Sequence, residues 1–344
     1  MLSAFDSCKQ HTKQKELPST IEKVHAANKI LVPKNGFSYG FVDREGTIWF
    51  SSNGGGIYQY DENTVKHFTV DNGLSSNQVF SIASDLNDHL WFGTQNGLTK
   101  FNGKHFEHIR LPFQDTSSVW LDKVYPVINP NAVHSLASDN NNNLWIGTAG
   151  GGTYSYDGET FKSYLTEIGR KQEDSLYHNW VPSIRKDNNG NMWFASMTHG
   201  GINRFDGNKF TQFLQKDGLS DNQVRTIYCD KKGNIWIGFN GNRNSGLTIY
   251  NGRTFRSYSS EDGLCNKQIR AIFEDNKGQI WLGGGSGNVC IFDGQKFNEF
   301  TNNGQNFRDV LFIFGDLKNN IWFGGKHGIW KFDGNIVTQI TATE

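Results

Sequence analysis

The sequence predicts an all-β protein, a seven-bladed β-propeller with four antiparallel strands in each blade. Three observations predict this fold class. A tryptophan motif recurs seven times, an Asp precedes each Trp at a constant distance, and an aromatic-Asp/Asn turn signal follows each Trp. The composition agrees, because 39 Gly, only 6 Pro and 14% aromatic residues suit many short strands joined by tight turns.

Each tryptophan lies in a hydrophobic-Trp-hydrophobic-small tetrad. The seven are Trp49, Trp91, Trp145, Trp193, Trp236, Trp281 and Trp322. Their spacings of 42, 54, 48, 43, 45 and 41 residues match the length of one four-stranded blade.

An Asp stands six residues before each of these tryptophans. The seven are Asp43, Asp85, Asp139, Asp187, Asp230, Asp275 and Asp316. Three residues after each Asp comes Gly, Asp or Asn, the types that tolerate positive φ. Each unit therefore predicts a strand, a tight turn that the Asp closes as an Asx-turn, and a second strand carrying Trp.

A second turn signal follows ten to fourteen residues after each Trp, where an aromatic residue precedes Asp or Asn, usually with Gly next. This predicts a hairpin into an outer strand. Neighbouring blades would bury the repeated Trp and Phe between their sheets, and radial repetition leaves only short edges. We expect the propeller over residues 29–344 after a tail of residues 1–28, with blades starting near residues 37, 79, 133, 181, 224, 269 and 310.

Charge and hydropathy argue against nucleic-acid binding and against a membrane-spanning segment. Equal numbers of basic and acidic residues, 34 each, argue against nucleic-acid binding, and no apolar run is long enough for a transmembrane segment. Cys8, Cys229, Cys265 and Cys290 show no CxxC spacing, so we expect free thiols, no metal site and no cofactor.

The combined pattern resembles the two-component regulator propeller repeat. Its best copy runs from Gly73-Leu74 through Asn77-Gln78-Val79 and Asp85 to Leu90-Trp91-Phe92-Gly93-Thr94, with echoes beginning at Gly218 and Gly263. The resemblance covers about residues 36–341. It implies a binding scaffold of the kind found in periplasmic sensor regions of histidine kinases, although this chain carries no kinase motif. A more distant similarity is to streptogramin lyases, whose repeat tends to read LWFTE.

Residues 2–10 resemble the end of a bacterial lipoprotein signal, with Cys8 as the lipidated residue and the polar stretch to about residue 28 as a tether. Seven residues before Cys8 are too few for the apolar region of such a signal. Two predictions therefore stay open: a periplasmic or outer-membrane lipoprotein, or a cytoplasmic protein with a disordered tail.

Two insertions mark the face where we expect function. The link from Ile109 to Val133 spans 24 residues and that from Tyr164 to Val181 spans 17, against ten or eleven elsewhere. Long loops in a compact domain are usually functional or disordered. The aromatic and His residues that these insertions contribute are Trp120, Tyr125, Tyr177, His178 and Trp180.

The residue after the first inner-strand hydrophobic varies between blades and includes His134, Arg225 and Arg270. If these side chains face the axis, the two arginines would bind a carboxylate, sulfate or phosphate. Alternatively, each pairs with a neighbouring Asp. His134, His178 and His199 fall on the same face, but no metal-ligand spacing links them, which favours polar loop histidines.

The predicted function is a non-catalytic ligand-binding or sensor propeller, exported, that binds a small anion, oligosaccharide or peptide at this face. Two alternatives stay open because fold does not determine function. One is a metal-dependent lyase that uses a His as base, and the other is a protein–protein interaction scaffold. The predicted ligand-binding residues are Trp120, Tyr125, His134, Tyr177, His178, Trp180, His199, Arg225 and Arg270.

Overall fold

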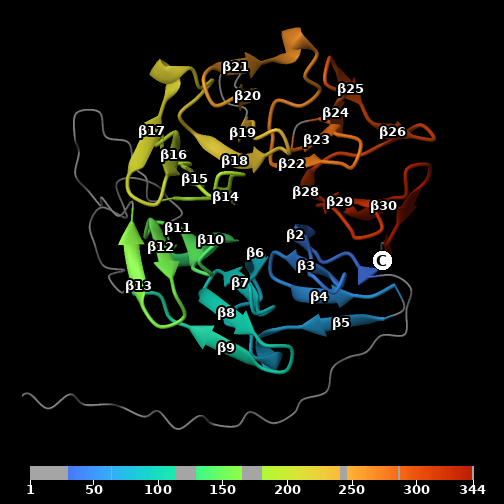
Figure 1. Ribbon diagram of the computed structural model, residues 1–344. Helices are drawn as coiled ribbons and strands as arrows, with labels where there is room; N and C mark the ends of the chain where they lie inside the picture. The colour runs from blue at the N-terminus through green and yellow to red at the C-terminus, as the bar shows by residue number, and fades with distance from the viewer. Residues whose placement is uncertain are drawn as a thin grey trace, which may run out of the picture.

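The computed structural model describes residues 30–62, 64–112, 129–164, 180–240, 246–285 and 287–342. Seven four-stranded antiparallel sheets surround a central axis, and each sheet is built from four consecutive strands. Figure 1 shows the first strand of every blade nearest the axis and the fourth at the outside. The predicted seven-bladed propeller is confirmed.

Blades one to three consist of β2 (Phe37–Val42), β3 (Ile48–Ser52), β4 (Gly56–Tyr60), β5 (Val65–Phe68), β6 (Val79–Ser84), β7 (Leu90–Thr94), β8 (Gly97–Phe101), β9 (Phe106–Ile109), β10 (Asn129–Ser138), β11 (Leu144–Ala149), β12 (Thr153–Tyr156) and β13 (Phe161–Tyr164). Blades four to six consist of β14 (Ile184–Lys186), β15 (Met192–Ala195), β16 (Ile202–Phe205), β17 (Phe210–Phe213), β18 (Val224–Cys229), β19 (Ile235–Phe239), β20 (Leu247–Tyr250), β21 (Phe255–Tyr258), β22 (Ala271–Glu274), β23 (Ile280–Gly283), β24 (Cys290–Phe292) and β25 (Phe297–Glu299). Blade seven consists of β28 (Val310–Gly315), β29 (Ile321–Gly325), β30 (Gly328–Phe332) and β31 (Val337–Gln339).

Short elements join the blades. One-turn 3-10 helices η1 (Val70–Asn72), η2 (Gln215–Asp217) and η4 (Ser260–Asp262) lie in the links that leave blades one, four and five. A small hairpin of β26 (Thr301–Asn302) and β27 (Gln305–Asn306) links blades six and seven. In the part of the chain that the structure describes, no helix is long and apolar enough to span a membrane.

The repeated Asp and Trp form the same latch in every blade. The Asp Oδ1 accepts a hydrogen bond from the backbone N–H four residues later in all seven blades, at 2.7–3.0 Å. In six blades the same oxygen also accepts from the N–H two residues later, which closes the predicted Asx-turn. Its Oδ2 accepts one from the Nε1–H of the Trp at 2.8–3.0 Å. The sequence did not predict this second bond, which ties the turn to the buried indole.

The aromatic side chains pack between neighbouring blades, as the repeat predicts. Trp49 of blade one is 2% exposed. Its ring lies about 6 Å from those of Phe68, Phe92 and Phe101, at 6.2, 6.0 and 6.0 Å between centroids, and the last two belong to blade two. Such offset and edge-to-face contacts add to the apolar burial that joins the sheets.

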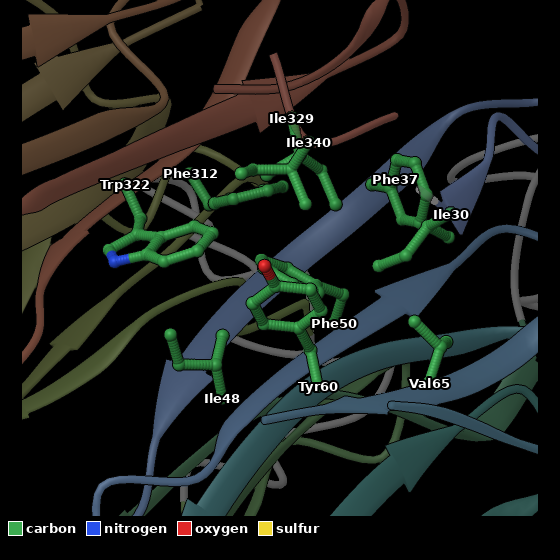
Figure 2. Close-up of a cluster of buried hydrophobic side chains, with 10 residues drawn as sticks. All are labelled: Ile30, Phe37, Ile48, Phe50, Tyr60, Val65, Phe312, Trp322, Ile329 and Ile340. Carbon is green, nitrogen blue, oxygen red and sulfur yellow. The ribbon is translucent and has the colours of Figure 1, made fainter. Parts of the chain in front are cut away.

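The two ends of the described chain close the ring. β1 (Ile30–Leu31) pairs in parallel with β32 (Thr341–Ala342), beside blade seven. Figure 2 shows the buried cluster between blades seven and one, where Trp322 and Phe312 meet Phe50. The ring therefore closes by apolar packing and a parallel clasp, and within the described chain each blade consists of four consecutive strands.

The prediction of four free thiols is wrong for Cys265 and Cys290, which form a disulfide with their Cα atoms 5.6 Å apart. The two lie 25 residues apart in the sequence and meet only when the third strand of blade six packs against the incoming link. Cys229 is a free, partly exposed thiol. Cys8 lies outside the described residues.

Candidate functional site

The inner strand of most blades carries a bulge just after its first hydrophobic residue. In β2, β6, β10, β18 and β28 the pairing register shifts just after the first hydrophobic residue, as between Val79 and Ser81. A bulge of this kind leaves one residue unpaired and redirects its side chain. The bulge residues, with their equivalents in blades four and six, are all partly exposed: Ser38, Phe80, His134, Pro182, Arg225, Arg270 and Leu311.

Electrostatic contacts place several of these side chains together. Arg225 of blade five acts on the pKa of His134 of blade three, and Arg270 of blade six acts on the pKa of Arg225. Blades three and five are not neighbours in the ring, so their side chains come close only near the axis. The axial mouth, defined here by Phe80, His134, Trp180, Arg225 and Arg270, is thus a single site formed by several blades.

The two arginines form a cationic pair without a counter-ion. Burial, and then the neighbouring charge of Arg270, lowers the pKa of Arg225 to about 10, so the guanidinium is still protonated at neutral pH. Within the described chain neither guanidinium donates a hydrogen bond or meets a carboxylate, and the Nε of Arg270 is buried without a partner. Two like charges held together and partly removed from water are unfavourable unless an anion joins them.

An aromatic row lies beside the arginines. The ring of His134 stacks on Phe80 with centroids 4.3 Å apart, and Trp180 meets His134 edge to face at 5.6 Å. Burial, and then the charge of Arg225, lowers the pKa of His134 to about 3. The imidazole is therefore neutral near pH 7 and acts as a flat aromatic surface rather than as a cation.

The described ends of the two insertions converge at the mouth. Asn129, which ends the insertion of blade three, and Trp180, which ends that of blade four, both pair with Ala149 at the end of β11. Both links therefore return to the same rim, as predicted. The other four predicted residues of the insertions, Trp120, Tyr125, Tyr177 and His178, lie outside the described residues.

Among the described residues, His199 makes no hydrogen bond or ring contact with His134, Trp180, Arg225 or Arg270, although its partner Gln223 lies two positions before Arg225. His199 is exposed in the β15–β16 link with φ at 67°, and its Nε2 lies 2.8 Å from the Nε2 of Gln223. Across the described ranges, no group of three or more His, Cys, Asp or Glu side chains could hold a metal ion. The structure thus brings four of the nine predicted residues together: His134, Trp180, Arg225 and Arg270.

Two features of the surface were not predicted from the sequence. Phe80 joins the aromatic row, and its signal was its place among the variable inner-strand residues. A cavity of about 400 Å³ lies between blades one and two, near the turns that hold the Asp–Trp latches, and is lined by polar groups such as Arg44, Lys66 and His89. That cavity is built from ordinary repeat positions, so no departure from the repeat could have indicated it.

Comparisons with known proteins agree with the repeat analysis. Residues 128–150, 218–241 and 263–286 match the two component regulator propeller family. The histidine kinase P4 of Formosa agariphila is 23% identical over 195 residues, which are 54% of this chain and 14% of the kinase. The chain thus spans a small part of that relative's length.

Two solved structures share the architecture. The extracellular domain of BT3049 of B. thetaiotaomicron, described as a hybrid two component system, superposes with a TM-score of 0.71 and 22% identity over 92% of this chain and 41% of that one. A streptogramin B lyase superposes with a TM-score of 0.69 and 15% identity, covering 92% of this chain and 97% of the lyase. At these identities the likeness establishes the fold alone. The chain is a seven-bladed β-propeller in which three segments match the two component regulator propeller family.

Proposed function

We propose that this protein is a non-catalytic sensor propeller that binds a small organic anion at the axial mouth. The observation that carries the proposal is the pair Arg225 and Arg270, two adjacent guanidiniums without an acidic partner among the described residues. Guanidinium groups recognise carboxylates, sulfates and phosphates through paired hydrogen bonds. A bound anion would relieve the repulsion between the two cations.

The aromatic row further restricts the chemical class of the ligand. Phe80, neutral His134 and Trp180 offer a flat apolar surface next to the charge. Such surfaces bind planar rings or the apolar face of a sugar. The ligand class that fits both parts is a ring bearing an acidic group, such as an acidic sugar or an aromatic acid. The predicted residues Trp120, Tyr125, Tyr177 and His178 would complete the site from the insertions.

The disulfide supports export of the protein. Disulfides persist mainly in oxidising compartments such as the periplasm and the cell surface. The Cys265–Cys290 bond therefore favours the exported alternative over the cytoplasmic one. A lipid anchor at Cys8 remains a prediction.

The lyase alternative gains no support from His134. A general base works best when its pKa lies near the working pH, and the pKa of His134 is about 3. The scaffold alternative would use the same rim, and a partner protein that places an acidic side chain in the mouth would satisfy the same arginines.

Calorimetric titration with matched ligands tests the proposal. We expect phenyl phosphate to bind more tightly than inorganic phosphate, because its ring adds contact with the aromatic row, and phenol to bind too weakly to measure. Replacing both Arg225 and Arg270 with Ala should weaken phenyl phosphate binding about 150-fold or more, since hydrogen bonds to charged groups contribute about 1.5–3 kcal/mol each and at least two are lost.

The control is Arg253→Ala, which removes the same charge from an exposed hairpin turn at the outside of blade five. It should leave the affinity unchanged. Equal affinities for wild type and for the double Arg variant would refute the anion site.

A further inference from the structure

The link that enters each blade can be compared across the repeat. In blade two the Ser75 Oγ lies 2.7 Å from the Thr99 Oγ1 of the third strand, and the Ser75 N–H donates to the same oxygen at 3.1 Å. Blade five repeats the arrangement with Ser220 and Thr248, at 2.7 and 3.3 Å. Two hydrogen bonds thus tie each link to the third strand of the blade it enters.

In blade six both of these positions are cysteines. Cys265 follows Gly-Leu as Ser75 and Ser220 do, and Cys290 occupies the place of the two threonines on the third strand. The Cys265 N–H still donates to the Cys290 Sγ at 3.3 Å, so the local geometry is retained. The disulfide has therefore replaced a hydroxyl–hydroxyl hydrogen bond with a covalent one.

Blade six, like blade four, also lacks a ladder pairing at the start of the inner strand that the other five blades have. In blade two Val79 pairs with Thr94, and in blade five Val224 pairs with Phe239. The corresponding residues of blade six are Ile269 and Gly284, and the ladder there begins only at Ala271. The segment from Cys265 to Arg270 is thus held by fewer ladder contacts than its counterparts in blades two and five.

The same segment crosses directly over a glycine. A Cβ on Gly284 would lie 1.4 Å from the Gln268 backbone oxygen, and one on Gly287 would lie 2.5 Å from the Cys265 oxygen. One on Gly285 would be in van der Waals contact with the Arg270 guanidinium, at 3.8 Å from Cζ. The path of the link and the position of Arg270 are thus coupled to residues 284, 285 and 287, which lead into the strand that begins at Cys290.

We propose that Cys265 and Cys290 are positioning residues, whose disulfide holds the 265–270 link and with it Arg270 in the axial mouth. The inference rests on the anion site proposed above and adds that its affinity depends on the thiol–disulfide state. Arg270 is only the fifth residue after Cys265, so release of the crosslink loosens the segment that carries the guanidinium. Reduction by dithiothreitol breaks the S–S bond, each sulfur gains a proton, and the reagent supplies two electrons and closes to its cyclic disulfide.

The matched control is the double variant Cys265→Ser/Cys290→Thr. It restores the hydrogen-bonded pair of blades two and five, so the blade should fold. It retains Cys8 and Cys229, so any effect of dithiothreitol through those two thiols should occur in the control as well as in wild type.

The experiment measures two quantities with and without dithiothreitol in both proteins. The first is amide hydrogen exchange at Ile269 and Arg270, whose N–H groups donate to the Phe239 and Gly283 oxygens. The second is the affinity for phenyl phosphate. In wild type we expect reduction to speed exchange at these amides about tenfold or more and to weaken phenyl phosphate binding about fivefold, and the control to respond in neither measurement.

The outcomes separate the two proposals. Unchanged exchange on reduction overturns the positioning role. Faster exchange with unchanged affinity also overturns it, because the link then moves without affecting the site. If reduction speeds exchange but neither the oxidised nor the reduced protein binds phenyl phosphate, the disulfide does hold the link in place. The anion site is then the proposal that fails.

Discussion

The seven blades are uniform at one position and carry six different residue types at another. At the turn that joins the first two strands of each blade, all seven place an Asp carboxylate on a Trp indole. At the inner-strand position that forms a bulge in five of the blades they carry Ser, Phe, His, Pro, Arg, Arg and Leu. The latch makes contacts that every blade needs for packing, so the same Asp and Trp occur in all seven blades. The axial side chains are not bound by that requirement, and there the chain departs from its repeat.

The comparison predicts that latch variants reduce stability and axial variants affect binding. The largest effect should come from Trp49→Ala. This indole is 2% exposed and packs on three aromatic rings. Its loss should lower the free energy of unfolding by about 3–5 kcal/mol, as measured by denaturant titration. A loss below about 1 kcal/mol would mean that the latch does not join blades one and two.

The second prediction concerns pH. The pKa of His134 is about 3 in the folded protein and near 6.5 in the unfolded chain. Between these values the unfolded state binds more protons, so stability falls as the pH is lowered through this window. From pH 6.5 to 4.5 we expect wild type to lose about 2 kcal/mol of unfolding free energy through this residue.

His134→Phe keeps a flat ring and should remove that part of the pH dependence. Denaturant titrations of both proteins at several pH values measure the difference. Parallel pH profiles for the two proteins would show that His134 titrates normally.

The third and smallest expected effect is an increase in stability. Arg225→Leu removes a partly buried cation that has no acidic partner among the described residues, and repulsion with Arg270 disappears. Replacing unfavourable buried charge with an apolar side chain is often neutral or stabilising, so the unfolding free energy should rise by up to about 1 kcal/mol while phenyl phosphate binding weakens. If stability drops instead, Arg225 is part of the packing and the contrast between latch and axis fails.

The fold could be predicted from the sequence because the latch and hairpin signals lie within about 20 residues of each other and recur in every blade. The proximity of Arg225 and Arg270 could also be predicted from the repeat, because side chains at equivalent positions of adjacent blades have the same orientation. The low pKa of His134 could not be predicted, because it depends on burial and on a charge two blades away.

The disulfide is the instructive error. Spacing along the chain gave no sign of it, because the two cysteines come from a link and a third strand. Alignment of the blades does carry a signal: Cys265 and Cys290 replace a Ser and a Thr that are bonded to each other in blades two and five. In a repeat protein, paired departures at positions that touch in the other copies are more informative than sequence spacing.

The most direct test of the central claim is a crystal structure grown with phenyl phosphate. We predict the phosphate between Arg225 and Arg270, with oxygens about 2.8 Å from both guanidiniums, and the phenyl ring against Phe80, His134 and Trp180. An axial mouth without phenyl phosphate, in which the two arginines instead pair with carboxylates of the protein, would contradict the claim.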